Sequence, residues 1–245
     1  MTSNPDSSFA AIIAAGGSGS RFAAGSNPAT AKQFLTLHGL PLYAWSLKTL
    51  AQHERITQLV MVVPSHMVQL TSDEIAALSD KLKLNRNISV ISGGDSRQAS
   101  VFNGLRFLSE QPSAPEFVMV HDAARPFLDE KTLDAVVDTA IKYGACTVGG
   151  AVSDTIKKVA GSKVVETLNR EELVAVQTPQ AARFQQLLAA HNEAIKSAFI
   201  ATDDVALMEW SGHEVHIVQG PGHNMKLTNP IDLILAEALA DILFK

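Results

Sequence analysis

The chain has 245 residues, of which 46% are hydrophobic and 18% charged, and its formal net charge is −5. These values fit one globular domain over residues 1–245 and give no reason to expect a nucleic-acid or membrane partner. The one cysteine, Cys146, excludes an internal disulfide and a cysteine-built zinc site, and no apolar run approaches the roughly 20 residues of a membrane span. The polar start of the chain lacks the pattern of a signal peptide, so we expect a cytoplasmic protein.

Short apolar runs alternate with helical patterns along the chain. The strand candidates are residues 9–15, 58–64, 88–94, 117–122, 146–152 and 214–220. The helix candidates are residues 41–53, 72–83, 96–110, 130–143 and 180–196, followed by a last helix that Asn229 caps. Most of the strand candidates are apolar at successive positions, which is typical of strands buried on both faces. The alternation predicts a doubly wound, mostly parallel α/β sheet, which binds ligands beyond the carboxyl ends of its strands.

Residues 153–178 interrupt this alternation. They contain two β-prone runs around the turn signal AGSK, so we expect a β-hairpin arm that projects from the sheet within the single domain. An isolated two-stranded ribbon is only marginally stable in water, so the arm should pack on something. A second copy of the chain is the simplest partner.

The loop AAGGSGSRF, residues 14–22, follows the first predicted strand. It is not a P-loop, because no Gly-Lys-Ser/Thr sequence ends it. A dinucleotide-binding fingerprint needs a small residue where Phe22 stands and an acidic residue about 20 positions later. No carboxylate lies between Asp6 and Glu54, which disfavours a dinucleotide site as well.

We interpret this loop as a binding site for a nucleoside triphosphate. Gly16, Gly17 and Gly19 let backbone N–H groups approach phosphate oxygens closely. Arg21 and Lys32 add cationic groups in a segment that has no acidic residue. The alternative interpretation is a strand-to-helix turn that binds no ligand.

Several other residues have both a structural and a functional interpretation. Asp122 ends a predicted strand, where an aspartate either binds a metal ion or caps the next turn. Asp95 is a candidate for the start of a helix, and for Asp203 and Asp204 we favour helix capping over catalysis. The histidines show no metal-ligand spacing and are interpreted as structural, and Cys146 as a buried strand residue.

Seven motifs occur in a fixed order along the chain. They are AAGGSGSRF (14–22), KQF (32–34), GGDSRQASV (93–101), VHDAARPF (120–127), TPQ (178–180), TDDVALME (202–209) and NMKLTNPIDLILAE (224–237). From about residue 10 to 240, this set closely resembles the 2-C-methyl-D-erythritol 4-phosphate cytidylyltransferases of the non-mevalonate isoprenoid pathway. The resemblance implies a Rossmann-like nucleotidyltransferase sheet with a protruding β-arm, and a homodimer.

The resemblance also implies the reaction and the residues that carry it. A cytidylyl group would pass from CTP to a sugar-alcohol phosphate with the help of Mg²⁺, and pyrophosphate would be released. The CTP site would comprise Ala14, Ala15, Gly16, Gly17, Gly19, Gly94, Asp95, Ser100 and Ala123. The catalytic cations would be Arg21, Lys32 and Lys226, and Asp122 would bind the metal.

For the second substrate, the resemblance implies a site shared between two subunits. The residues that would face methylerythritol phosphate are Arg125, Thr155, Arg170 and Thr178, of which Thr155 and Arg170 lie on the arm and reach into the neighbouring subunit. His223 stands where some members of the family carry an aspartate near the metal. This difference leaves Asp122, phosphate oxygens and water as the expected metal ligands.

Three alternative functions stay open at this point. Ribitol-5-phosphate cytidylyltransferases share much of the motif set, although the arm pattern NREEL…TPQ favours methylerythritol phosphate as the substrate. A nucleotide-binding module without catalysis would not require Lys32 or Lys226, which are both present. A nicotinamide-dependent oxidoreductase is disfavoured by Phe22 and by the missing acidic residue.

Overall fold

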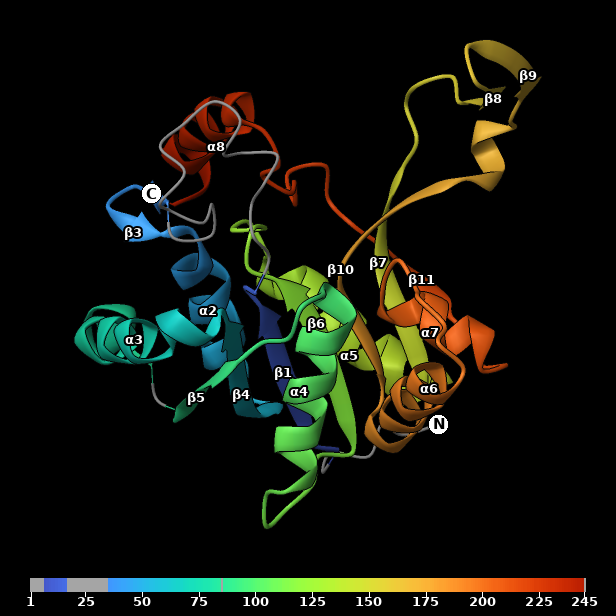
Figure 1. Ribbon diagram of the computed structural model, residues 1–245. Helices are drawn as coiled ribbons and strands as arrows, with labels where there is room; N and C mark the ends of the chain where they lie inside the picture. Colours follow the sequence, from blue (N-terminus) through green and yellow to red (C-terminus); the bar gives the residue numbers. More distant parts are fainter. Residues whose placement is uncertain (1–6, 17–34, 85, 245) are drawn as a thin grey trace.

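A computed structural model describes residues 7–16, 35–84 and 86–244 (Figure 1). The strands are β1 (Phe9–Ala14), β2 (Thr36–Leu37), β3 (Leu40–Pro41), β4 (Ile56–Val63), β5 (Ile88–Ser92), β6 (Phe117–Asp122), β7 (Ala145–Ala151), β8 (Lys157–Ala160), β9 (Lys163–Thr167), β10 (Val174–Arg183) and β11 (His216–Gln219). The α-helices are α2 (Leu42–Gln52), α3 (Val68–Leu82), α4 (Arg97–Ser109), α5 (Glu130–Tyr143), α6 (Phe184–Lys196), α7 (Asp204–Trp210) and α8 (Pro230–Leu243). Two short 3₁₀ helices, η2 (Ser65–Met67) and η3 (Arg170–Glu172), complete the described elements.

Seven strands form the central sheet in the order β11-β7-β10-β6-β1-β4-β5. β10 runs antiparallel to both of its neighbours, and the other pairings in this sheet are parallel. The sheet therefore has the mostly parallel α/β architecture that the sequence predicts. The carboxyl ends of β1, β4, β5 and β6 meet along one edge, which is the edge where ligands bind in such sheets.

β10 differs most from the sequence-based expectations. The helix expected from Gln180 begins at Phe184 instead, because residues 180–182 pair with β6 on one side and with β7 on the other. Of the expected arm, residues 174–178 belong to β10 and only β8 and β9 form the hairpin. Pro179 made this run a poor strand candidate, since proline donates no ladder hydrogen bond. It lies where the pairing with β7 is interrupted, between Val176 and Gln180.

Apolar layers cover both faces of the sheet. Successive residues of β1 point to opposite faces, so Ile13 joins the layer formed by α2, α3 and α5, whereas Ile12 joins the layer formed by α4, α6 and α7. Residues 9–13 are fully buried, as expected for a strand covered on both sides. Cys146 is buried in β7, where burial raises the pKa of its thiol to about 12 and leaves it a packing residue.

α8 packs on a third apolar cluster beside the main sheet. Leu37 of β2, Leu42 of α2 and Phe127, which follows β6, form this cluster with Ala236 and Ala240 of α8. The predicted cap is confirmed, because the Asn229 side chain and Asp232 form a reciprocal capping box at the start of the helix. In the part of the chain that the structure describes, no helix combines the length and apolarity needed to cross a bilayer.

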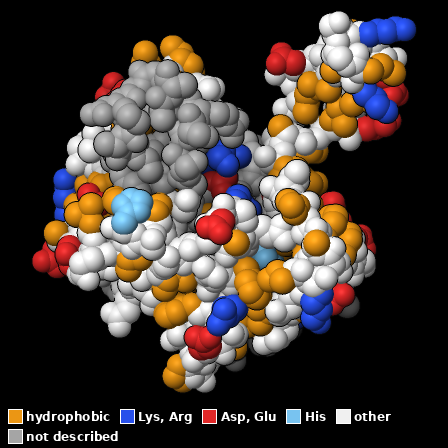
Figure 2. All heavy atoms as spheres, in the orientation of Figure 1, with side chains coloured by type: hydrophobic (Ala, Val, Ile, Leu, Met, Phe, Trp, Pro, Cys, Tyr) orange, Lys and Arg blue, Asp and Glu red, His pale blue; other side chains and the backbone are white. Residues whose placement is uncertain are grey.

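The hairpin of β8 and β9 projects from the body on two extended connections (Figure 1). It has little core of its own, and the side chains of Val159, Val164 and Val165 are each more than half exposed. Hydrophobic and charged side chains therefore share its surface (Figure 2). A two-stranded ribbon of this kind is expected to be stabilised by packing on another surface.

The close approach of α4 to β1 yields a test of the packing. A Cβ at Gly104 would lie 3.0 Å from Cδ1 and Cγ2 of Ile12, so there is no room for a branched side chain. Gly104→Val is expected to lower the free energy of unfolding by about 1–3 kcal/mol, measured by urea denaturation. Ile12→Ala should lower the free energy of unfolding less in the Gly104→Val variant than in the parent, because it makes room for the valine. An unchanged midpoint in Gly104→Val alone would contradict the packing argument.

Candidate active site

Three loops meet at the carboxyl ends of the strands. The Ala123 N–H, just after β6, donates to the carbonyl of Ala14 at the end of β1, at 3.1 Å. The Gly93 N–H, just after β5, donates to the carbonyl of Val63 in β4 at 2.7 Å. Backbone hydrogen bonds thus fix the start of the glycine-rich loop, the 93–96 loop and the loop after Asp122 relative to one another.

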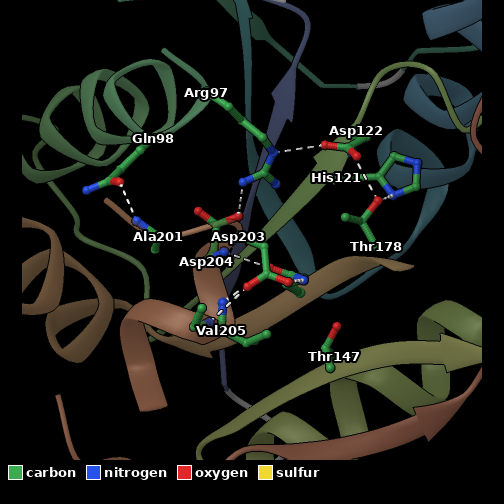
Figure 3. A network of polar contacts seen from close by, with 12 residues as sticks. Arg97, Gln98, His121, Asp122, Thr147, Thr178, Ala201, Asp203, Asp204 and Val205 are labelled. Atoms are coloured by element: carbon green, nitrogen blue, oxygen red, sulfur yellow. Dashed lines mark hydrogen bonds and ion pairs between the residues drawn. The ribbon is translucent and has the colours of Figure 1, made fainter. Parts of the chain in front are cut away.

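Asp122, the last residue of β6, lies at the centre of this edge with 6% of its surface exposed. Arg97 Nε donates to one carboxylate oxygen at 3.1 Å (Figure 3). Lys226 Nζ donates to the other oxygen at 2.5 Å. Lys226 reaches Asp122 because its neighbour Leu227 donates a backbone hydrogen bond to the Ala124 carbonyl at 2.9 Å. Both oxygens of one buried carboxylate are therefore bound by cationic side chains.

These contacts keep Asp122 ionised. Burial by itself would raise the pKa of this carboxyl. The positive charges of Arg97 and Lys226 and the hydrogen bond from Lys226 outweigh burial, and they hold the pKa of Asp122 well below its usual range. A negative charge is thus maintained at the strand end at neutral pH.

A buried hydrogen-bond chain orients Asp122 from the side of β10. The Asp122 N–H donates to Thr178 Oγ1 at 3.1 Å, and that hydroxyl lies 3.1 Å from His121 Nδ1 (Figure 3). His121 Nε2 lies 3.1 Å from the Arg125 carbonyl, which can only accept, so Nε2 carries the proton and Nδ1 accepts from Thr178. Burial lowers the pKa of His121 to about 4, which agrees with a neutral ring that has a structural role.

Arg125 is a buried cation on the same loop, with 8% of its surface exposed. Its Nη1 donates to the Asn224 carbonyl at 2.8 Å, and Asn224 Nδ2 donates in turn to the Thr178 carbonyl at 3.0 Å. Arg125 Nε has no hydrogen-bond partner among the described residues. A buried donor without a partner is costly, so this side chain is a strong candidate for contact with a bound anion.

The second end of the Arg97 guanidinium faces α7. Its Nη1 lies 2.8 Å from Asp204 Oδ2, and His191 Nε2 lies 3.6 Å from the other oxygen of Asp204. Burial would lower the pKa of Arg97, but the charges of Asp204 and Asp122 outweigh it and raise the pKa. Arg97 therefore carries a permanent charge that two buried carboxylates share.

The expectation that Asp203 and Asp204 cap a helix holds for Asp203. Its Oδ1 accepts from the Ala206 N–H at 2.9 Å, and the side chain of Asp204 turns to Arg97 instead. Gln180 of β10 fixes this turn, because its Oε1 accepts from the Asp204 N–H at 2.9 Å and its Nε2 donates to Asp203 at 3.0 Å.

Two glycines allow loops to lie close to α4: Gly16 at the start of the glycine-rich loop and Gly94 in the 93–96 loop. A Cβ at Gly16 would lie 2.9 Å from Ser100 Oγ, and a Cβ at Gly94 would lie 2.7 Å from the Cβ of Ala99. Ser100 itself is buried and donates to the Ser96 carbonyl at 2.8 Å. The helix cap is Ser96 and not the expected Asp95, which is exposed beside it.

The structure brings together only part of the expected site. Ten of the expected site residues lie at or next to this edge: Ala14, Ala15, Gly16, Gly94, Ser100, Asp122, Ala123, Arg125, Thr178 and Lys226. Gly17, Gly19, Arg21 and Lys32 lie outside the described residues. Thr155 and Arg170 are exposed on the arm, where Arg170 Nη1 donates to the Ser153 carbonyl at 3.0 Å. Within one chain, the arm carries them away from Asp122 (Figure 1).

Sequence reasoning missed the pairing of Arg97 with Asp204. Both residues lie inside quoted motifs, GGDSRQASV and TDDVALME, but they are more than one hundred positions apart. The available signal was two charged residues, each at the expected start of a helix. Figure 2 shows charged side chains of both signs gathered in the hollow between the body and the base of the arm.

The donor set fits a magnesium ion held mainly by substrate. Among the described residues, no group of three His, Cys, Asp or Glu side chains could hold a metal ion by itself. Mg²⁺ commonly binds through one or two carboxylates together with phosphate oxygens and water, and Asp122 is an ionised carboxylate at the right edge. His223 does not join it, because its Nε2 lies 3.0 Å from Asp129 at the start of α5.

The chain is similar to known proteins over almost its whole length. Residues 9–241 match the family model described as 2-C-methyl-D-erythritol 4-phosphate cytidylyltransferase. Proteins of that name from Halalkalibacterium halodurans and Geobacillus thermodenitrificans are each 40% identical to this chain, with matches that cover 94% of it and 96% of each relative.

Solved structures give the same result. The 4-diphosphocytidyl-2C-methyl-D-erythritol synthase of Anaerococcus prevotii has a TM-score of 0.82 at 25% identity and covers 96% of both chains. The 2-C-methyl-D-erythritol 4-phosphate cytidylyltransferase of Thermus thermophilus has a TM-score of 0.72 at 27% identity, over 95% of this chain and 98% of that one. The resemblance found in the motifs is therefore confirmed: the chain belongs to the 2-C-methyl-D-erythritol 4-phosphate cytidylyltransferase family.

Proposed function

We infer that the edge of the sheet around Asp122 is where this chain carries out the reaction of its family. A phosphate oxygen of 2-C-methyl-D-erythritol 4-phosphate attacks the α-phosphorus of CTP. The bond from that phosphorus to the β-phosphate breaks, so pyrophosphate leaves and 4-diphosphocytidyl-2-C-methyl-D-erythritol forms. The product enters isoprenoid precursor biosynthesis. The observation that carries this assignment is the contact of Lys226 and Arg97 with one ionised carboxylate at the strand end.

The chemistry requires cations more than it requires a base. Both substrates are anionic, so they repel each other, and the transition state gathers further negative charge around the α-phosphorus. We propose that Arg21, Lys32 and Lys226 supply the stabilising charge. No general base is needed, because a phosphate monoester is already ionised near neutral pH. The neutral, buried His121 agrees with such a mechanism.

We propose that Asp122 is the protein ligand of Mg²⁺. When bound, the ion would neutralise phosphate charge and fix the geometry of the triphosphate. The role of this chain is to hold the Asp122 carboxylate ionised and in one orientation, through Thr178 on one side and Arg97 on the other. The glycine-rich loop, with Gly94, Asp95, Ser100 and Ala123, would bind the nucleotide.

We propose that the protein acts in the cytoplasm and binds methylerythritol phosphate between two subunits of a homodimer. Arg125 and Thr178 would contact it from the body, and Thr155 and Arg170 from the arm of the partner. The exposed valines of the arm support this arrangement, because they need a surface to cover them. The planar guanidinium of Arg170 suits a phosphate, since it can donate two hydrogen bonds at once.

The role of Lys226 is tested by removing its charge. Lys226→Met is expected to lower turnover about 10²–10³-fold, because an oriented cation near the reacting phosphorus is lost. The measurement is pyrophosphate release from CTP, with thermal melting to establish that the variant is folded. Lys131→Met, a change at an exposed lysine of α5, is the matched control. A folded Lys226→Met enzyme within about threefold of the parent rate, roughly 0.65 kcal/mol, would remove Lys226 from the mechanism.

The role of Asp122 is tested by metal dependence. In the parent protein, Mg²⁺ is expected to tighten CTP binding, and calorimetric titrations with Mg²⁺ and with EDTA give this effect as a ratio of the two dissociation constants. Asp122→Asn keeps the size of the side chain and removes its charge, so the ratio should fall toward one. A ratio unchanged from the parent would mean that other groups bind the metal.

The shared site is tested by mixing two inactive chains. Arg170→Ala removes an arm residue and Lys226→Ala a body residue, so one site of a mixed dimer carries both changes and the other carries neither. Random reassortment should restore up to about a quarter of the parental activity, since half of the dimers are mixed and each has one intact site. Exchange is verified by co-purification of differently tagged chains. No recovery despite exchange would mean that Arg170 acts within its own subunit.

A further inference from the structure

The Arg97 guanidinium links two carboxylates that lie on different elements. Its Nε bonds to Asp122 at 3.1 Å, and its Nη1 lies 2.8 Å from Asp204. The side chains of Asp122 and Asp204 are 9% and 3% exposed, so water contributes little to stabilising either charge. Figure 3 shows Arg97 reaching from α4 between the two acids, with Asp204 on the side of α7.

The Asp, Arg and Lys side chains that pair directly in this group are balanced in charge. Asp122 and Asp204 contribute two negative charges, and Arg97 and Lys226 contribute two positive charges. The nearby Arg125 adds a further positive charge but donates to a backbone carbonyl. If Asp204 were neutral, the whole charge of Arg97 would act on Asp122. The group would then be more attractive to a phosphate and less attractive to a divalent cation.

Asp204 is not needed to cap α7. Asp203 already caps that helix, and Gln180 accepts hydrogen bonds from the N–H groups of Asp204 and Val205. The Asp204 carboxylate also lies 3.6 Å from His191 Nε2. A buried charge with no capping function and a direct ion pair to the partner of Asp122 indicates a role in the site.

We propose that Asp204 is a positioning residue that neutralises Arg97 and so leaves the negative charge of Asp122 available to a divalent cation. This inference rests on the proposed function, in which Asp122 binds the metal that accompanies CTP. Asp204 acts through Arg97 and touches neither substrate nor metal. Its effect is therefore expected chiefly in the metal dependence of CTP binding, with opposite signs in the presence and absence of the metal.

The test measures a coupling factor, defined as the dissociation constant of CTP in EDTA divided by that in Mg²⁺. Asp204→Asn should lower this factor about tenfold or more, the order expected when one buried unit charge near a divalent cation is removed. It should also tighten CTP binding in EDTA, because the group gains positive charge. Arg97→Gln should raise the factor above the parent value. The double variant Arg97→Gln/Asp204→Asn restores the charge balance and should return to within about threefold of the parent.

Asp203→Asn is the matched control, because it removes one negative charge from the same helix start and keeps a residue able to cap. Its coupling factor should stay within about threefold of the parent. If the role of Asp204 were purely structural, Asp204→Asn would weaken CTP binding equally with and without Mg²⁺. The double variant would then bind CTP more weakly still. Either result overturns the inference, as does an equal effect of Asp203→Asn. If Asp204→Asn does not fold, the required rise in Arg97→Gln decides the matter.

The same titrations separate this inference from the proposed function. A coupling factor near one in the parent protein would overturn both, because no metal would then accompany CTP at Asp122. A factor well above one that Asp122→Asn abolishes, but that Asp204→Asn leaves unchanged, would overturn the role of Asp204 alone.

Discussion

The site depends on one buried carboxylate that must stay charged. Asp122 ends a strand that is covered on both faces, and a charge at such a place is stable only if cations pair with it. The chain supplies them from distant segments: Arg97 from the start of α4 and Lys226 from the segment before α8. The ion pairs therefore also hold the fold together, because they join β6 to α4 and to the segment before α8.

The antiparallel strand β10 serves both sides of this group. Thr178 accepts from the backbone of Asp122, and two residues later Gln180 fixes the turn that carries Asp203 and Asp204. β10 lies between β6 and β7, so it fixes the position of Asp122 at the end of β6 relative to α7, which carries Asp204. The amino-terminal end of β10 connects to the arm, so the same strand supports the site and carries the arm.

The sequence predicted the elements whose pattern is local. β6 was predicted with its observed ends, since its six residues are all buried and Asp122 terminates the apolar run. β10 was not recognised as a strand of the main sheet, because Pro179 and two glutamines interrupt its apolar pattern and its position depends on pairing with β6 and β7. Ser100 was assigned to nucleotide from its motif, but its burial against Gly16 is visible only in three dimensions. The pairing of Arg97 with Asp204 is long-range in the same way, and no spacing rule connects the two.

The balance of charge also explains how a site built from so few protein carboxylates can serve a reaction between anions. Before substrates bind, Lys226 and Arg97 are both paired with Asp122, and Arg97 is also paired with Asp204. In the proposed reaction Lys226 would turn from Asp122 to oxygens of the triphosphate, and Asp122 would hold the metal ion. Arg97 is held by Asp204 and can stay in place during this exchange. Asp122 and Lys226 would thus each keep a partner of opposite charge before and after the substrates bind. This exchange requires that Asp122 be ionised and correctly oriented before binding.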